Sequence, residues 1–328
     1  MQQHFEFVGT AHYLPRKLLL ASEVDQRLGL EIGWTEKNTG VLARYECCEP
    51  ESLATMAKQV VGQAMKNAQV DWPDIDLIID CSTCRRQPIP INAALLQAEF
   101  GQAAAGIPCL DLQSTCLGFL CTLNVVNGLL ATDAYRQVLI VCAEANLAGV
   151  NTNEPESAAL MGDGAAAVIV RKSSAERNCY FKHETYAQYH RECQVRGGGH
   201  DLPVFKYHQN AEADFRFHMD GPAIYRAALR LLPPMVNQLI QVSGLDRKLL
   251  HTIPHQASPR AVETIRRVLG LRREKYENRV AGMGNLAAAS IPTVLDIIRF
   301  EQSVAPAQSL LLLGTSAGYS QAAMIVSL

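Results

Sequence analysis

The sequence predicts an α/β protein made of two similar halves, and two observations support this fold class. Short apolar stretches typical of strands alternate with longer stretches typical of helices, and the order of these features repeats once along the chain. Five expected strands are nearly all apolar, as central strands covered on both faces usually are: Leu77–Ile79, Val138–Val141, Ala166–Val170, Leu310–Leu313 and Ala323–Val326.

The repeat divides the chain into halves of residues 1–171 and 172–328. Three pairs of positions mark it: Leu77 and Leu249 as well as Val138 and Leu310, each 172 residues apart, and Cys116 and Asn285, 169 residues apart. Two copies indicate a duplicated domain rather than a repeat array. We therefore expect Cys116 and Asn285 at equivalent helix starts that face one another. The polar segment of about 172–215 is expected to connect the halves, with loops that border a site.

The composition is that of an ordinary globular protein. Its 328 residues are 48% hydrophobic and 19% charged, and a net charge of −2 gives no reason to expect nucleic acid or a membrane surface as partner. The first residues lack the basic start and apolar run of a signal peptide, and no apolar stretch reaches the roughly 18 residues that span a bilayer. We therefore expect a cytoplasmic protein.

The ten cysteines lie mostly in apolar segments, so we expect most of them to be reduced core residues. Cys81 and Cys84 have the spacing of a redox or half-zinc site. No second Cys or His pair nearby completes such a site, so we expect no metal.

Cys116 directly precedes a helix expected over about 117–131, whose apolar residues fall on every face; such a helix should be buried. Unpaired N–H groups and the positive end of the helix dipole stabilise a thiolate at such a place. A thiolate there can attack a thioester near neutral pH. The segment alone is equally consistent with a buried structural cysteine.

Three further segments carry candidate residues. His255 follows the apolar Ile253-Pro254, and Asn285 follows Gly284 and precedes a run of small residues. Ala317 lies in a turn of small residues, whose backbone N–H groups are candidates for an oxyanion hole. Each segment is a weak signal alone, and their order and spacing in a duplicated chain are a stronger one.

Seven stretches of the chain match motifs of one enzyme family: Val8–Pro15, Thr39–Val41, Asp74–Ile79, Gly162–Gly164, Met219–Gly221, Ile253–Ala257 and Gly284–Pro292. Over nearly its whole length the chain resembles the beta-ketoacyl-[acyl carrier protein] synthase III enzymes of the thiolase-like superfamily. The resemblance implies a five-layer αβαβα fold, a homodimer, and a catalytic triad of Cys116, His255 and Asn285.

The resemblance also implies a reaction that needs no bound cofactor. An acyl group from coenzyme A or a carrier protein would pass to Cys116, with the oxyanion held by the backbone N–H groups of Cys116 and the loop near Ala317. His255 and Asn285 would donate hydrogen bonds to the carbonyl of a malonyl thioester as it decarboxylates. The enolate would then attack the acyl group and form a 3-oxoacyl thioester. An Asp in place of Asn285 would repel that charge and favour simple acyl transfer.

The substrate entrance departs from the family pattern. Trp34 resembles an aromatic that stacks on the adenine of coenzyme A, but Asn38 and Pro155 stand where the family usually carries arginines that grip the coenzyme. The first substrate could therefore be an acyl carrier protein instead of acyl-CoA, or the entrance is remodelled. Ile89 stands where the family often has a Phe that reaches the partner subunit's acyl pocket, which suggests room for a longer or branched acyl group.

A basic cluster follows the catalytic His: Arg260, Arg266, Arg267, Arg272, Arg273 and Lys275. Carrier proteins are acidic, so this cluster could dock one and steer its approach. The alternative is a solvated helix face.

Three competing interpretations remain. The chain could be a specialised ketosynthase or acyltransferase of secondary metabolism with the same fold. A papain-like hydrolase also uses Cys, His and Asn in this order, but the local Cys signature of that class is missing. A non-catalytic subunit that keeps the fold is opposed by the intact triad. Acyl chain length and the extender unit are not determined by the sequence.

Overall fold

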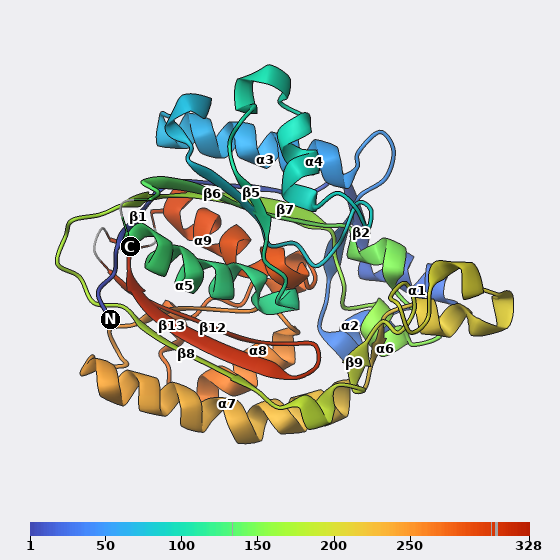
Figure 1. Ribbon diagram of the computed structural model, residues 1–328. Helices are drawn as coiled ribbons and strands as arrows, with labels where there is room; N and C mark the ends of the chain where they lie inside the picture. The colour runs from blue at the N-terminus through green and yellow to red at the C-terminus, as the bar shows by residue number, and fades with distance from the viewer. Residues whose placement is uncertain (133, 303, 306–307) are drawn as a thin grey trace.

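The computed structural model describes residues 1–132, 134–302, 304–305 and 308–328. Two β-sheets lie one above the other with helices between them (Figure 1). The first sheet has the strand order β1 (Phe5–Tyr13), β7 (Gly164–Lys172), β6 (Gln137–Glu144), β4 (Leu77–Asp80), β5 (Cys109–Asp111). The second has the order β8 (Tyr180–Thr185), β13 (Ser320–Ser327), β12 (Ser309–Ser316), β11 (His251–Pro254).

The two sheets share one pairing pattern, which is how the duplication appears in three dimensions. In the first sheet β4 and β6 are parallel, and β7 is antiparallel to both β6 and β1. In the second sheet β11 and β12 are parallel, and β13 is antiparallel to both β12 and β8. All five predicted strands are confirmed, as parts of β4, β6, β7, β12 and β13. The division of the chain after residue 171 stays a prediction.

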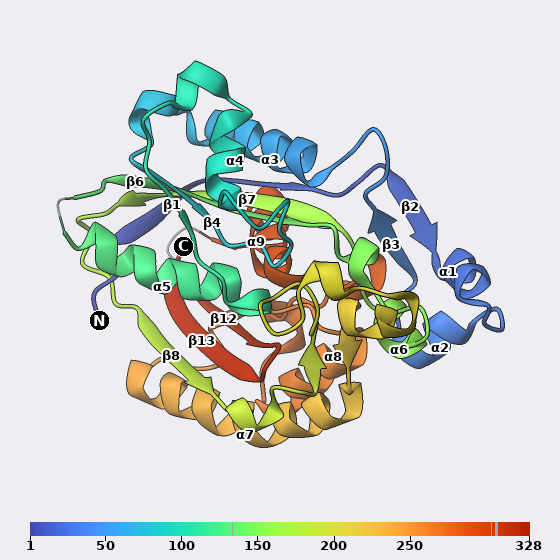
Figure 2. The same ribbon diagram turned by 45° about the vertical axis from the view of Figure 1, so that its right-hand side comes forward.

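Helices form the other three layers (Figures 1 and 2). The middle layer between the sheets holds α5 (Gly118–Leu130) and α9 (Ser290–Phe300). The outer layers are α3 (Leu53–Ala68) with α4 (Asn92–Ala98), and α7 (Gly221–Ser243) with α8 (Pro259–Val268). Three hydrophobic cores lie between the layers. One surrounds the middle helices and contacts both sheets, and one lies between each sheet and its outer helices. This confirms the predicted α/β class and the αβαβα order.

The predicted buried helix is α5. Most of its side chains pack between the two sheets, with Phe119, Leu120 and Leu123 fully buried, but Val125 is 41% exposed, so the helix is not buried on every face. A 3-10 turn, η3 (Thr115–Leu117), precedes it. Cys116 therefore lies at the entrance to the helix, as the sequence predicted.

Shorter elements surround the two sheets. Strands β2 (Lys17–Leu20) and β3 (Ala43–Glu46) pair with each other, as do β9 (Cys193–Gln194) and β10 (His218–Met219). Helices α1 (Ala21–Leu28), α2 (Trp34–Thr39) and α6 (Pro155–Ala158) lie beside β9 at one end of the sheets (Figure 1). The remaining 3-10 turns are η1 (Trp72–Asp74), η2 (Gly101–Ala104), η4 (Asn146–Gly149), η5 (Ala187–Tyr189), η6 (Val204–Lys206), η7 (Gln209–Phe215), η8 (Arg273–Lys275), η9 (Val280–Gly282) and η10 (Ala287–Ala289). Within the described ranges, none of the helices combines the length and apolar character needed to cross a membrane.

The structure corrects two details of the predicted repeat. Leu77 pairs with Val138 in the first sheet, and His251 pairs with Leu310 in the second. The counterpart of Leu77 is therefore His251 and not Leu249, which precedes β11 and is exposed. The segment 172–215 is also more than a connection, because it contributes β8 to the second sheet.

Candidate active site

Cys116 lies where the two halves of the protein meet. The turn η3 that carries it packs against β12 and against η10, the corresponding turn before α9. The residue is half-buried. One side of the candidate nucleophile is therefore formed by the first half of the chain and the other by the second.

The surroundings of Cys116 disfavour the thiolate. Burial raises the pKa of the Cys116 thiol above its usual range, and the nearby Cys193 and Glu144 raise it further. A hydrogen bond from the backbone N–H of Cys116 opposes them but does not prevail. The cost of removing the sulfur anion from water thus opposes the thiolate stabilisation that the sequence predicted at this helix start. We therefore expect the thiol to lose its proton as it attacks.

His255 continues the line of β11 and is held against β12. Its backbone N–H donates to the carbonyl oxygen of Leu313 at 2.7 Å. The residue is 5% exposed, and burial lowers the pKa of its imidazole to about 4. Among the residues that the structure describes, its Nδ1 has no hydrogen-bond partner. His255 is thus neutral at pH 7, a form that donates an N–H without carrying a charge.

Gly314 brings His255 and the nucleophile turn to the same point of β12. A Cβ at Gly314 would lie 2.7 Å from the Cβ of His255 and 3.3 Å from Cδ2 of Leu117. Real Cβ atoms essentially never approach as closely as the first distance. A glycine is therefore required here for His255 and the residue after Cys116 to pack against the strand together.

Asn285 has a structural counterpart in the first half, but it is Gln113 and not Cys116. The side-chain oxygen of Asn285 accepts the N–H of Ala287 at 2.9 Å, and that of Gln113 accepts the N–H of Thr115 at 2.9 Å. Thr115 and Ala287 both have a φ of 45°, a left-handed conformation that costs energy for a residue with a side chain. The predicted equivalence of Cys116 and Asn285 is therefore wrong by three residues, although the two helix starts do face one another.

The amide of Asn285 is oriented toward the segment that follows His255. Its Nδ2 donates to the carbonyl oxygen of Ala257 at 3.4 Å, a long hydrogen bond. Two backbone hydrogen bonds hold Asn285 in place: its N–H donates to the carbonyl oxygen of Leu160 at 2.8 Å, and its carbonyl oxygen accepts the N–H of Gly162 at 3.0 Å. One N–H of the amide is used by Ala257, and the other can donate to a substrate oxygen. The structure thus brings Asn285 and the His255 segment together.

Ala317 lies in the tight turn between β12 and β13, where the last strand pair is Ser316 with Ser320. Gly318 and Tyr319 reverse the chain with φ values of 73° and 35°. The turn follows Gly314 on the strand that contacts His255. The role of the Ala317 N–H as an oxyanion donor stays a prediction.

The predicted substrate residues are spread over two regions. Trp34 begins α2 and packs against the small apolar cluster around Val24. Asn38 is exposed, and its Nδ2 donates to the carbonyl oxygen of Trp34 at 2.8 Å. Ile89 lies in the loop between β4 and α4, and 84% of it is exposed, so its side chain points away from this chain's core. Their roles toward substrate stay predictions.

Three arginines of the predicted docking cluster, Arg260, Arg266 and Arg267, differ in their surroundings. Arg266 grips the carboxylate of Glu263 through Nε at 2.9 Å and Nη2 at 2.8 Å, and donates to the Leu271 carbonyl at 2.7 Å. Arg267 also contacts Glu263, at 2.8 Å, but its side chain is 72% exposed. Arg260 is exposed and donates to the carbonyl of Lys37. The side chain of Arg266 is therefore engaged in contacts around α8. Arg260 and Arg267 are more exposed and are better candidates for contact with an acidic carrier protein.

Glu144 was not among the site residues predicted from the sequence. It ends β6 fully buried, and its carboxylate accepts the N–H groups of Thr83 at 2.7 Å and Cys84 at 3.0 Å. Burial raises the pKa of Glu144 to about 7. The available signal was an acidic residue at the end of the apolar run that begins at Val138, since buried acids are rare and are held by hydrogen bonds.

Comparisons with known proteins point to one family. A family model described as 3-oxoacyl-[acyl-carrier-protein (ACP)] synthase III matches residues 110–188, and the model of that family's C-terminal part matches residues 244–328. The chain is 27% identical over 325 residues to beta-ketoacyl-[acyl-carrier-protein] synthase III of Neisseria gonorrhoeae, with 99% of each chain covered.

Solved structures share the fold over the full length. The 3-oxoacyl-[acyl-carrier-protein] synthase III of Aquifex aeolicus aligns with a TM-score of 0.88 and 23% identity, covering 99% of this chain and 100% of the other. The priming beta-ketosynthase of the R1128 polyketide pathway aligns with a TM-score of 0.90 and 24% identity, covering 100% and 97%. At these identities the likeness concerns the fold alone.

Proposed function

Because the chain belongs to the 3-oxoacyl-[acyl-carrier-protein] synthase III family, we propose that it joins an acyl thioester to a malonyl thioester with loss of CO₂. The protein is an acyltransferase of the condensing class. The substrates we propose are an acyl group on coenzyme A or acyl carrier protein, and malonyl-acyl carrier protein or a related malonyl thioester. The product is a 3-oxoacyl thioester.

The first half-reaction loads the acyl group on Cys116. The sulfur attacks the thioester carbonyl, loses its proton, and expels the thiol of coenzyme A or the carrier. The N–H groups of Cys116 and Ala317 hold the oxyanion of the tetrahedral intermediate. The high thiol pKa makes proton loss part of this step, so loading should speed up as pH rises.

The second half-reaction forms the carbon–carbon bond. The C–C bond to the malonyl carboxylate breaks, CO₂ leaves, and the electron pair becomes an enolate whose oxygen accepts hydrogen bonds from His255 and Asn285. The enolate carbon attacks the acyl group on Cys116 and releases the thiolate. Each such donor typically supplies about 3 kcal/mol to the transition state, roughly two orders of magnitude in rate.

The observation that best supports this proposal is the state of the two donors. His255 is buried and neutral, and Asn285 is fixed by three hydrogen bonds of 2.8 to 3.0 Å with its Nδ2 at the segment after His255. Hydrogen-bond donors that are already held in place in a site shielded from water stabilise a developing negative charge more strongly than the same donors in water.

The test follows the mass of the intact protein. Purified protein is exposed to a panel of acyl-CoAs and acyl carrier proteins, beside a Cys116→Ala control, and malonyl carrier protein is then added. We expect an acyl adduct on Cys116 that disappears with formation of a 3-oxoacyl product. An adduct that malonyl thioester cannot discharge would refute the condensation and leave acyl transfer to another nucleophile.

A specialised ketosynthase or acyltransferase of secondary metabolism is the second candidate. The observation in its favour is the entrance, where Asn38 and Pro155 replace the expected arginines and Trp34 is held in a packed cluster. Efficient loading by acetyl-CoA alone would exclude a remodelled entrance. Loading only by an acyl carrier protein, or by a long or branched acyl group, would favour this candidate.

We also propose a cytoplasmic homodimer. Strand β5 forms one edge of the first sheet, with Leu110 exposed on it, and Ile89 is exposed in the loop between β4 and α4. The unpaired backbone N–H and C=O groups of an edge strand can pair with another chain. Light scattering at micromolar concentration tests this, and a monomer mass would refute the dimer.

A further inference from the structure

Gln256, the residue after His255, is a buried side chain with its polar atoms all engaged. Its Nε2 donates to the carbonyl oxygen of Pro254 at 2.7 Å and to that of Glu277 at 3.3 Å. Its Oε1 accepts the N–H of Arg279 at 2.7 Å. No part of the residue is exposed. One side chain therefore ties the backbone on both sides of His255 to a second segment of the chain.

That second segment leads to Asn285. It runs beside the end of β11, where the N–H of Glu277 donates to the carbonyl of Thr252 at 3.0 Å. From Arg279 it continues through η9 to Asn285, whose Nδ2 returns to the carbonyl of Ala257. Gln256 and Asn285 thus form two links between the same pair of backbone segments, at the two residues that directly follow His255.

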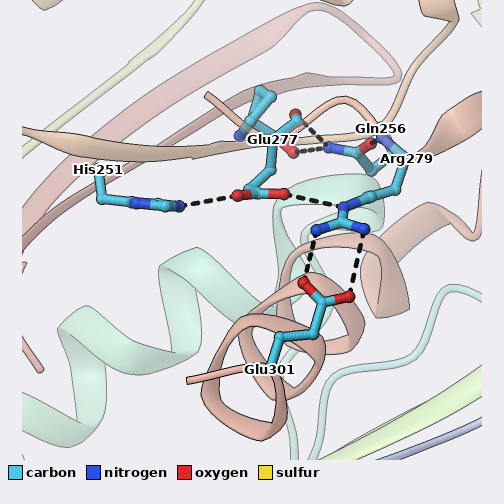
Figure 3. Close-up of polar contacts among 6 residues, drawn as sticks. His251, Gln256, Glu277, Arg279 and Glu301 are labelled. Carbon is cyan, nitrogen blue, oxygen red and sulfur yellow. Dashed lines mark hydrogen bonds and ion pairs between the residues drawn. The ribbon is translucent and has the colours of Figure 1, made fainter. Parts of the chain in front are cut away.

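A charged network anchors the far side of this segment (Figure 3). The Glu277 carboxylate accepts Nε2 of His251 at 2.8 Å and Nε of Arg279 at 2.9 Å. Arg279 also binds Glu301, at the end of α9, at 2.8 Å. Burial opposes the ionisation of Glu277, but hydrogen bonds from His251 and Arg279 outweigh it and lower its pKa. The segment of Glu277 and Arg279, to which Gln256 is hydrogen-bonded, is therefore itself attached to β11 and α9.

We propose that Gln256 is a positioning residue that sets the spacing between His255 and Asn285 for decarboxylation. It touches no reacting atom and acts through the backbone of its neighbours. The inference rests on the proposed function, because it matters only if both donors must reach one thioester oxygen. A displacement of about 1 Å in such a pair is enough to cost roughly a hundredfold in rate.

The proposal predicts an unequal effect on the two half-reactions. Loading of Cys116 uses the thiol and backbone N–H groups, and none of these is bound by Gln256. Decarboxylation uses His255 and Asn285 together. Loss of Gln256 should therefore slow condensation far more than loading, whereas a general loss of stability would slow both alike.

The experiment compares Gln256→Leu with Gln3→Leu. Gln3 makes a similar set of bonds at the C-terminal end of β13: it is fully buried, its Nε2 donates to the carbonyl oxygens of Phe5 at 3.0 Å and Ser327 at 2.9 Å, and its Oε1 accepts the N–H of Ser327 at 2.8 Å. The rate of acyl-Cys116 formation is measured by intact mass, and CO₂ release or product formation from pre-acylated protein gives the condensation rate. Urea unfolding is measured for both variants.

We expect Gln256→Leu to load within twofold of wild type and to condense at least tenfold more slowly. Gln3→Leu should lose comparable stability and keep the wild-type ratio of the two rates. If Gln256→Leu does not fold, Gln256→Glu, which keeps the size and the acceptor for Arg279 but loses the amide donor, is measured in its place. Its condensation should be more than twofold slower than that of wild type, with loading within twofold of wild type.

Two results overturn the proposal. One is a condensation rate within twofold of wild type in a folded Gln256 variant, and the other is an equal fall in both half-reactions. Wild-type protein that loads but never condenses would instead refute the proposed function, so the two failures are distinguishable.

Discussion

Replacing Gly314 with alanine tests whether the close packing of β12 against His255 controls the reaction. The new Cβ would lie 2.7 Å from the Cβ of His255 and 3.3 Å from Cδ2 of Leu117. Carbon atoms pack at about 3.5 to 4.0 Å, so His255 or the strand must move by about 1 Å. Because the crowded atom is the first carbon of a buried side chain, no flexible end can give way cheaply.

The expected cost has two parts. Overpacking of a well-packed interior typically destabilises a protein by about 1 to 3 kcal/mol. A 1 Å displacement of a catalytic group can slow the reaction about a hundredfold. We therefore expect Gly314→Ala to remain folded, with a lower urea midpoint and a condensation rate about two orders of magnitude below wild type.

The matched control is Gly128→Ala in α5, where an added Cβ meets nothing within 4 Å. Alanine in a helix interior is favoured over glycine by about 1 kcal/mol, so this variant should be at least as stable as wild type and equally active. A folded Gly314→Ala protein that condenses within threefold of wild type would refute the argument that His255 depends on this contact.

Four further predictions concern single groups of the site. Asn285→Ala should leave loading of Cys116 nearly unchanged and slow condensation by about two orders of magnitude, or about 3 kcal/mol; equal slowing of both, measured on pre-acylated protein, would contradict the role of Asn285 as an enolate donor. His255 has a folded-state pKa of about 4 against about 6.5 in an unfolded chain, so between these values the unfolded state binds more protons. The free energy of unfolding of wild type, minus that of His255→Gln, should rise with pH by up to about 1.4 kcal/mol per unit in this window and be constant above it; a flat difference in urea titrations from pH 4 to 7 would show that burial does not hold the imidazole neutral. Glu144→Gln removes a negative charge that raises the pKa of the Cys116 thiol, so alkylation of Cys116 by iodoacetamide should become faster and shift to lower pH, and an unshifted profile would contradict that coupling. Arg267→Glu should slow carrier-dependent turnover several-fold at low salt and little at high salt, and unchanged kinetics at low salt would exclude docking at this arginine.

The strand and helix pattern was readable from the sequence because each element has to match its surroundings along its whole length. The runs at Val138 and Leu310 are almost entirely apolar, and they became β6 and β12, buried between helix layers on both faces. The same logic predicted a buried α5. The exact alignment of the two halves was not readable, because a nearly all-apolar run fits a buried strand in more than one alignment.

The sequence by itself determined the chemical types of the site: a thiol before an apolar helix, an imidazole after a strand, and an amide before a run of small residues. Their protonation was decided only by the tertiary structure. Cys116 has a raised thiol pKa because it is buried and because Cys193 and Glu144, from distant parts of the chain, lie near it. Desolvation depends on atoms that the fold gathers from elsewhere, and a local motif contains no information about them.

The contacts that position the site also belong to the tertiary structure alone. Gln256 stands in the printed sequence as an ordinary polar residue beside His255, and Gly314 as one more small residue in a strand. Only packing shows that Gln256 joins the backbone around His255 to the segment leading to Asn285, and that Gly314 leaves just enough space for His255. The sequence specifies which groups can react. The folded chain fixes the distances between them and their exposure to water, and the rate depends on both.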